Sequence, residues 1–188
     1  MFVIRMGNDS HRFRKEKEKE KENKIFSKEI KEPKKIYSEF FDNNNNNNNN
    51  NIFYLSSHKF YKNDEIDENS TVICAINKEL EGQQWKFITN YEGIYEIKFN
   101  LDDYKMKNWN VSITDDENII LSNDDTYKKT AFILIEKEDE NNSNNFYIQD
   151  ALTGKFLGID REKKRDKISY FLNLTKEKEF VWKIKNVD

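Results

Sequence analysis

The chain has 188 residues, of which 36% are hydrophobic and 36% charged, and its formal net charge is −3. This length allows one domain of ordinary size with an appendage. Residues 1–51 have a net charge of +3 and residues 52–188 of −6. The acidic body argues against nucleic acid as a ligand, because neutralising phosphates requires a basic face.

Two segments of biased composition dominate the N-terminal part of the chain. Residues 12–22 are almost wholly Lys or Arg alternating with Glu, and residues 43–51 are nine consecutive Asn. Such segments carry too little apolar surface to offset the entropy of ordering, so the sequence predicts a disordered tail over residues 1–51. The apolar residues between 25 and 41 leave a short docking helix as an alternative, which Pro33 would end or kink.

Cysteine content and hydropathy indicate where the protein resides. Cys74 is the only cysteine, so no intrachain disulfide can form, and it lies in an apolar segment typical of a buried strand. The apolar run at residues 1–4 is too short for a signal peptide, and no stretch approaches a transmembrane segment in length. The sequence therefore predicts a cytoplasmic protein.

A unit recurs three times after residue 51, over residues 53–88, 95–135 and 146–184. Each unit begins with an aromatic residue at a strand start, continues with a β-branched run and closes on a bulky aromatic residue: Trp85, Phe132 or Trp182. Copies of one supersecondary unit must bury their apolar faces against each other. We therefore expect these three aromatic residues to be structural residues of a shared core.

Short alternating segments separated by Asn and Asp clusters follow one another through these units. They predict about four strands per unit and about twelve in all, and in the third unit roughly 146–149, 155–159, 168–172 and 180–184. Twelve short strands in three copies suit a β-trefoil, in which six strands close a barrel and three hairpins cap it. The sequence thus predicts an all-β protein, with a β-trefoil domain over residues 52–188.

Two of the units resemble the ricin B-type lectin family. Gln83, Gln84 and Trp85 match the Gln-x-Trp ending of that family's units, and residues 153–157 (Thr-Gly-Lys-Phe-Leu) match its second-strand signature. The resemblance covers residues 53–184 and implies a trefoil fold and carbohydrate binding. The glutamine is replaced in the other two units, which end Thr-Ala-Phe at 130–132 and Phe-Val-Trp at 180–182.

The same Gly-Lys-aromatic-Leu segment resembles actin-binding trefoils of the fascin and hisactophilin type. That resemblance implies a different function, a protein-binding cytoskeletal adaptor with actin as a partner. The Gln-Gln-Trp ending favours the lectin interpretation.

In the lectin family, a sugar site combines an acidic residue after the second strand with an aromatic residue near the end of the third. Only the third unit offers such a set, with Asp160, Phe171 and Asn173. Asp160 would accept hydrogen bonds from sugar hydroxyls, Phe171 would stack on the sugar and Asn173 would fix its orientation. The structural alternatives are a solvated turn residue at Asp160 and a core residue at Phe171.

Residues that could carry catalysis are sparse. His11 and His58 are remote from each other, five glycines form no phosphate-binding loop, and no Cys/His spacing typical of a metal site occurs. We therefore expect no enzyme, no metal and no cofactor. The leading hypothesis is a non-catalytic carbohydrate-binding module that binds a glycan or glycoconjugate at a single weak site.

Overall fold

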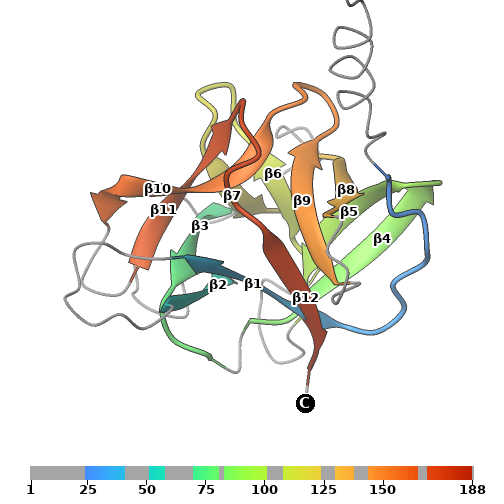
Figure 1. Ribbon diagram of the computed structural model, residues 1–188, viewed down its shortest axis with the longest axis horizontal. Helices are drawn as coiled ribbons and strands as arrows, with labels where there is room; N and C mark the ends of the chain where they lie inside the picture. The colour runs from blue at the N-terminus through green and yellow to red at the C-terminus, as the bar shows by residue number, and fades with distance from the viewer. Residues whose placement is uncertain are drawn as a thin grey trace, which may run out of the picture.

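The computed structural model describes residues 24–40, 51–57, 70–80, 83–100, 108–123, 130–137, 144–164 and 169–187. These residues form twelve antiparallel β-strands and no helix, so the predicted all-β class is confirmed (Figure 1). Within them, no helix is long and apolar enough to cross a membrane. The strands are β1 (Lys34–Phe40), β2 (Asn51–Ser57), β3 (Ser70–Ile76), β4 (Trp85–Tyr91), β5 (Ile94–Phe99), β6 (Asn110–Ile113), β7 (Ile119–Ser122), β8 (Phe132–Glu136), β9 (Asn145–Asp150), β10 (Phe156–Lys164), β11 (Ser169–Thr175) and β12 (Trp182–Asn186).

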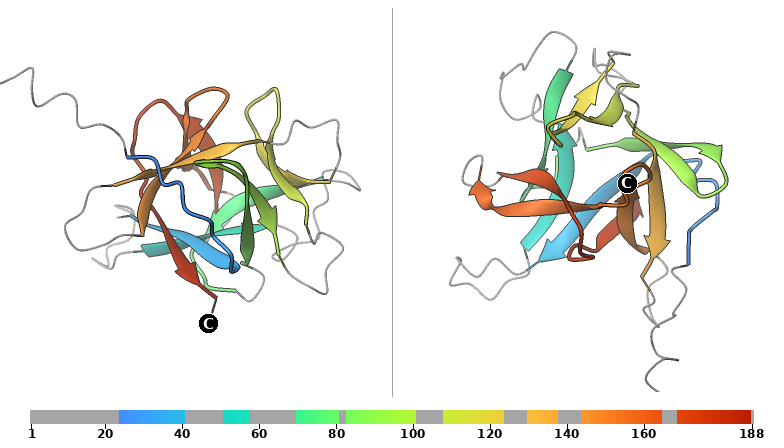
Figure 2. Two further views of the ribbon diagram at one scale, coloured as in Figure 1. Left: turned by 90° about the vertical axis from the view of Figure 1, so that its right-hand side faces the viewer. Right: turned by 90° about the horizontal axis from the view of Figure 1, so that it is seen from above.

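Six of the strands pair in a closed order. Strand β1 pairs with β4, β4 with β5, β5 with β8, β8 with β9, β9 with β12, and β12 with β1. The other six strands form the hairpins β2–β3, β6–β7 and β10–β11. Strand β3 also pairs with β7 and β11, so the three hairpins meet (Figure 2). Closed pairing leaves few free strand edges.

Side-chain alternation explains why these segments form strands. In β5, Tyr95, Ile97 and Phe99 are buried, while the residues between them are partly exposed. Turns between strands use glycine where the backbone requires it: Gly93 has φ +78° between β4 and β5, and Gly154 has φ +72° between β9 and β10. A left-handed φ of this kind favours glycine because it has no Cβ.

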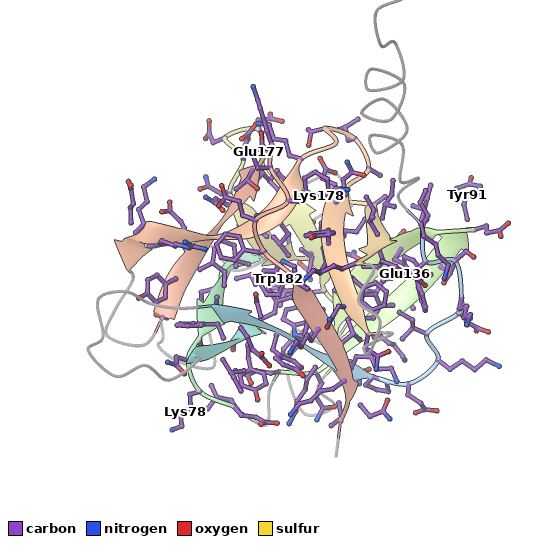
Figure 3. All side chains as sticks on the ribbon, viewed as in Figure 1. Lys78, Tyr91, Glu136, Glu177, Lys178 and Trp182 are labelled. Atoms are coloured by element: carbon purple, nitrogen blue, oxygen red, sulfur yellow. The ribbon has the colours of Figure 1, made fainter. Side chains whose placement is uncertain are left out.

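The core is built around the aromatic residues at the start of β4, β8 and β12. Trp85, Phe132 and Trp182 are at most 1% exposed, and Trp182 lies near the middle of the molecule (Figure 3). The Trp85 indole N–H donates to the Leu55 carbonyl oxygen at 3.1 Å, and the Trp182 indole N–H donates to the Leu157 carbonyl oxygen at 2.9 Å. Both indoles therefore bind the backbone of the neighbouring hairpin in the same way.

Strand β1 departs from the predicted disordered tail over residues 1–51. It pairs with β12 on one side and with β2 on the other, and Ile36 is fully buried between them. A single buried isoleucine among charged residues gives a weak sequence signal, because the partner strands supply most of the apolar surface. Residues 24–33 are also described, and they form no helix. The Lys/Glu-rich segment 12–22 and Asn43 to Asn50 lie outside the described residues.

Because β1 belongs to the domain, the first unit starts earlier in the chain than the sequence predicts. The sequence places the opening strand of the first unit at Phe53, but Phe53 lies in β2, and β1 precedes it. The Asn tract therefore falls between two paired strands, with Asn51 opposite Phe40, rather than in front of the domain. In the third unit, strands β9 to β12 start within two residues of the predicted starts.

Candidate functional site

The three residues predicted to bind sugar lie on adjacent strands, Asp160 on β10 and Phe171 and Asn173 on β11. In this hairpin Gly158 lies opposite Asn173, and the next pair along is Ile159 and Leu172. Leu157, Ile159, Tyr170 and Leu172 belong to the core. Because successive side chains point to opposite faces of a strand, Asp160, Phe171 and Asn173 share the face of the hairpin opposite to these core residues.

The Asp160 carboxylate is partly committed to its own backbone. Its Oδ1 accepts hydrogen bonds from the backbone N–H groups of Glu162 and Lys163, both at 3.1 Å, where the register of β10 shifts. The Lys163 Nζ lies 3.9 Å from the Asp160 Oδ2, and the Asp160 side chain is 20% exposed. Asp160 thus stabilises the irregular end of β10 and keeps Oδ2 as its available acceptor.

The Asn173 amide oxygen lies inside the protein rather than on its surface. It is buried and has no hydrogen-bond partner among the described residues. A Cβ added at Gly158 would come within 2.7 Å of this oxygen and within 3.1 Å of the Phe180 ring. Phe180 is itself buried, and the Arg161 guanidinium lies 5.0 Å from its ring centroid. The hairpin therefore brings Asp160 and the half-buried Phe171 toward the surface, and Phe180 packs beside Asn173.

The first hairpin offers a direct comparison. The Trp85 indole donates its hydrogen bond to Leu55, and the Trp182 indole donates to Leu157, so these two leucines occupy corresponding positions. Ser56 therefore corresponds to Gly158. Ser56 lies opposite Cys74, as Gly158 lies opposite Asn173. The Cys74 thiol is 3.8 Å from the Ser56 carbonyl oxygen and is fully buried. The first hairpin thus has a thiol where the third has an amide.

A second feature lies in the segment for which the sequence left a short docking helix as an alternative, and it packs against the core without forming a helix. Residues 24–33, which we call the strap, run across strands β5, β8 and β9 before entering β1 (Figure 1). The Phe26 N–H donates to the Leu134 carbonyl oxygen, and the Glu136 N–H donates to the Lys24 carbonyl oxygen, both at 2.8 Å. The Phe26 ring meets Phe146 edge-on, with centroids 5.2 Å apart. The apolar residues at 25, 26 and 30 are the sequence signal for this packing.

Tyr95 holds the strap by hydrogen bonds to its backbone. Its hydroxyl lies 3.1 Å from the Phe26 carbonyl oxygen and 2.8 Å from the Lys28 carbonyl oxygen. The side chain is fully buried, and this burial raises the pKa of Tyr95 to about 12. The hydroxyl therefore remains a neutral donor at physiological pH.

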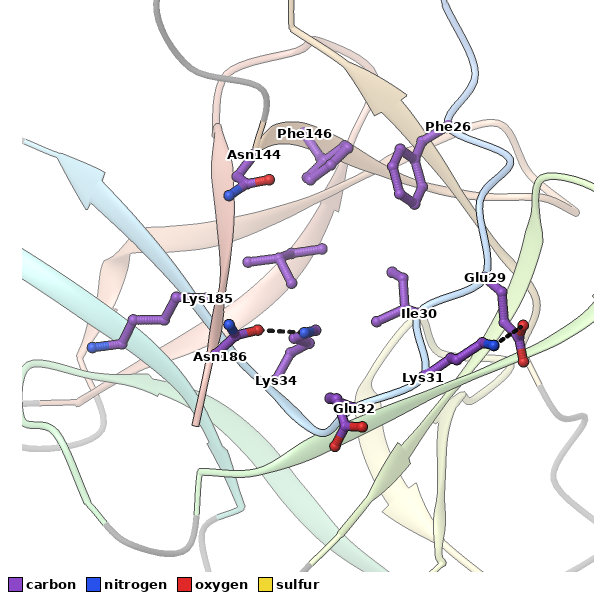
Figure 4. A pocket seen from close by; sticks show the side chains of 11 residues that line it. Phe26, Glu29, Ile30, Lys31, Glu32, Lys34, Asn144, Phe146, Lys185 and Asn186 are labelled. Carbon is purple, nitrogen blue, oxygen red and sulfur yellow. Dashed lines mark hydrogen bonds and ion pairs between the residues drawn. The ribbon is translucent and has the colours of Figure 1, made fainter. Parts of the chain in front are cut away.

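The strap and strand β12 enclose a groove of about 650 Å³ (Figure 4). Its apolar lining comes from Phe26 and Ile30 of the strap together with Phe146 and Ile184. The remaining lining residues are polar or charged: Glu29, Lys31, Glu32, Lys34, Asn144, Lys185 and Asn186. This volume lies within the range of about 300–1,000 Å³ that is usual for ligand sites.

The strand registers explain why space remains there. Tyr95 pairs with Phe132, and Phe146 pairs with Trp182. At the corresponding place in the first unit, Lys34 pairs with Trp85. Two of these three positions thus carry aromatic rings, Tyr95 and Phe146. The position in the first unit carries Lys34, whose ammonium extends to the Asn186 amide oxygen. The groove lies beside Lys34, where an aromatic ring is absent.

A polar network joins the loop after β3 to strands β1 and β12. The Glu79 carboxylate lies 2.5 Å from the Lys35 Nζ and 3.2 Å from the Lys185 Nζ, and the Tyr54 hydroxyl donates to it at 2.9 Å. The hydrogen bonds from Lys35 and Tyr54 lower the pKa of Glu79 to about 2. Three side chains of the protein donate to this carboxylate, which indicates a structural role for the network.

The described residues contain no group of three or more His, Cys, Asp or Glu side chains placed to hold a metal ion. Neither candidate region therefore suggests a metal ligand set in the part of the chain that the structure describes.

Several solved structures are similar to this chain, among them the following two. A salivary protein from Culex quiquefasciatus, which belongs to the Cysteine and Tryptophan-Rich family, aligns with a TM-score of 0.54 and 10% identity, over 87% of this chain and 99% of that one. A Caenorhabditis elegans protein with unknown function aligns with a TM-score of 0.53 and 12% identity, over 89% of this chain and 98% of that one. At such identities the likeness concerns the fold alone. No family model matches the chain, and no curated protein matches its sequence.

Proposed function

We propose that this chain is a non-catalytic binding protein with a β-trefoil fold. Three observations support the trefoil: six strands pair in a closed order, the other six form three hairpins that meet, and an aromatic residue opens the last strand of each unit. The Trp85 and Trp182 indoles make the same hydrogen bond to a leucine carbonyl oxygen, which supports a backbone structure that recurs in the first and third units. The three units are then β1–β4, β5–β8 and β9–β12.

The ligand class with the best support is carbohydrate, bound on the outer face of the β10–β11 hairpin. The observation that carries this proposal is that Asp160, Phe171 and Asn173 share one face of two adjacent strands. A sugar requires an apolar face against its C–H groups and polar atoms against its hydroxyls. Phe171 offers the first and the Asp160 carboxylate the second, whereas the Asn173 amide oxygen is buried. Residues 83–85 and residues 153–157 resemble motifs of the ricin B-type lectins, and this resemblance supports the same ligand class.

The geometry refines the role of each residue. The Asp160 Oδ2 atom would accept a hydrogen bond from a sugar hydroxyl, because Oδ1 is already engaged by two backbone N–H groups. Phe171 would supply the stacking surface. Asn173 acts as a positioning residue in this proposal, since its amide oxygen faces Gly158. A shallow single site of this kind predicts weak affinity, with Kd on the order of 0.1–1 mM.

A glycan array probed with the full chain tests the proposal. Asp160→Asn keeps an oxygen for the turn hydrogen bonds but replaces the free acceptor with a donor, so it should abolish the array signal without changing the melting temperature. Asp115→Ala, at an exposed turn between β6 and β7, is the matched control and should leave the signal intact. Glycan binding that survives Asp160→Asn and Phe171→Ala would place the site elsewhere.

Protein binding is the second candidate function, and the open apolar groove favours it. F-actin is the first partner to test, because residues 153–157 resemble trefoils of the fascin and hisactophilin type. Co-sedimentation with F-actin, combined with an array without signal, would replace the lectin proposal. A cytoplasmic location is retained for both candidates, on the basis that Cys74 has no second cysteine to pair with.

A further inference from the structure

The groove between the strap and β12 has an apolar end and a polar end. The Phe26 and Phe146 rings meet at the apolar end, and Phe146 pairs with Trp182, the first residue of β12. The Lys34 ammonium donates to the Asn186 amide oxygen at the polar end, where β12 finishes. Figure 4 shows these two groups on opposite sides of the groove, so a ligand that spans it needs both an apolar and a polar part.

The apolar end is preformed. Phe146 and Ile184 belong to the core, and Phe26 and Ile30 pack against it. The rings of Phe26 and Phe146 contact each other edge-on, with centroids 5.2 Å apart. A ligand would therefore contact side chains that are already held in place, which limits the entropy lost on binding. A bulky apolar or aromatic group fits this end best.

Two lysines that line the groove are directed to carboxylates of the protein. The Lys31 ammonium lies 3.6 Å from the Glu29 carboxylate. The Lys185 ammonium extends away from the other lining side chains toward Glu79, which it shares with Lys35 (Figure 4). These ammonium groups are therefore held by the protein itself, and the recognition of a ligand falls to the remaining charged side chains.

Two charged side chains at the polar end have no ion-pair partner among the described residues. The Lys34 ammonium binds only the neutral Asn186 amide, and the exposed Glu32 carboxylate binds no side chain. Because the Asn186 amide oxygen accepts from Lys34, its N–H₂ group remains a donor beside the ammonium. A ligand carboxylate alone would also face Glu32, and a ligand ammonium alone would also face Lys34. A ligand that carries both groups satisfies both residues.

We propose that the groove binds a free amino acid with a bulky apolar side chain. The ligand carboxylate binds the Lys34 ammonium and the Asn186 amide, and the ligand ammonium pairs with Glu32. The ligand side chain lies against Phe26 and Phe146. This site is separate from the β10–β11 face and does not depend on carbohydrate binding.

A matched series of ligands tests the proposal by amide NMR titration of the ¹⁵N-labelled full chain at neutral pH. L-Phenylalanine carries all the required groups, whereas 3-phenylpropionate lacks the ammonium, 2-phenylethylamine lacks the carboxylate and glycine lacks the apolar side chain. L-Phenylalanine should give saturable shifts at Ile30, Lys34 and Ile184, with Kd on the order of 1 mM. Each of the other ligands should bind at least about fivefold more weakly.

Variants assign the two charges. Lys34→Met keeps most of the side-chain length but removes the ammonium, so it should weaken the binding of L-phenylalanine about fivefold. Glu32→Gln should weaken it about threefold, because an exposed ion pair is screened by solvent, and should melt at the temperature of the wild type. Lys176→Met is the matched control and should bind like the wild type, because Lys176 is exposed and does not line the groove.

Three results would overturn the proposal. The first is the absence of saturable shifts at the groove residues with L-phenylalanine. The second is an affinity for 3-phenylpropionate or 2-phenylethylamine that equals the affinity for L-phenylalanine. The third is unchanged binding of L-phenylalanine to both Lys34→Met and Glu32→Gln.

Discussion

The hairpins β2–β3 and β10–β11 share a framework but differ where a ligand would bind. In both, a buried indole N–H donates to the carbonyl oxygen of a leucine, Leu55 in one and Leu157 in the other. One residue further on, Ser56 lies opposite Cys74 in the first hairpin, and Gly158 lies opposite Asn173 in the third. The residues that hold the backbone thus repeat, whereas those that could meet a ligand do not.

The same contrast holds at the strap end of the molecule. Lys34 lies opposite Trp85, in the place that Phe146 takes opposite Trp182. The groove beneath the strap lies at this position, where Lys34 takes the place of an aromatic residue. Both candidate sites therefore lie where the units diverge, and the four predictions below test how much each difference matters.

The largest expected effect concerns the shared framework. Trp85→Ala and Trp182→Ala should each lower the free energy of unfolding by about 3–5 kcal/mol, because each leaves a large cavity at a fully buried position. Urea denaturation measures both. Similar losses would support equivalent positions, and a loss below about 1 kcal/mol for either indole would show that the two hairpins are not held alike.

The next prediction separates the two hairpins. Gly158→Ala should lower the free energy of unfolding by about 1–3 kcal/mol, since the added methyl group would lie 2.7 Å from the Asn173 amide oxygen. Ser56→Ala, at the corresponding position, is the control and should change stability by less than about 1 kcal/mol, because the serine already carries a Cβ. Chemical denaturation of both variants gives the comparison. Equal effects would indicate that Asn173 and Phe180 can move aside.

Tyr95→Phe tests how the strap is held and should cost about 1–2 kcal/mol, since the carbonyl oxygens of Phe26 and Lys28 lose their donor. The pKa of Tyr95 is raised to about 12, above the ordinary value of 10.0. The stabilisation should therefore be complete below pH 10 and be lost as the pH rises from 10 to 12. Denaturation at several alkaline pH values should show a smaller dependence in Tyr95→Phe than in the wild type.

The smallest effect is expected at Glu79. Glu79→Gln should lower the free energy of unfolding by about 1 kcal/mol or less, because the carboxylate is 41% exposed and its ion pairs are screened by solvent. Its pKa is lowered to about 2 from the ordinary 4.5, so this contribution is present above pH 4.5 and is lost as the pH falls toward 2. A cost well above this range at neutral pH would mean that the loop after β3 depends on Glu79.

The sequence predicts strands best where side-chain alternation is strong. Residues 94–99 and 146–150 alternate between buried and partly exposed positions, and their strands were predictable from that pattern alone. Strand β1 was not, because the buried Ile36 lies in a segment rich in Lys and Glu, which gives little alternation. Its order depends on β2, β4 and β12, which no local pattern reveals.

The candidate sites show the same limit. That Asp160, Phe171 and Asn173 would lie near each other follows from the hairpin, but the packing of Phe180 beside Gly158 comes from a later segment of the chain. The groove required both the strand registers and the course of the strap. A sequence pattern places residues along strands, whereas tertiary packing decides which of them reach the surface.

The most direct test of the central claim, that only the third hairpin carries a carbohydrate site, is a two-dimensional amide NMR titration. The ligand is the glycan that gives the strongest array signal, added to the uniformly ¹⁵N-labelled full chain. The account predicts saturable shifts at one site per chain, centred on Asp160, Phe171 and Asn173, and smaller shifts at Ser56 and Cys74, because Cys74 lies opposite Phe171 in the β3–β11 pair. Shifts centred on the first hairpin or on the groove, or the absence of any glycan that binds, would contradict it.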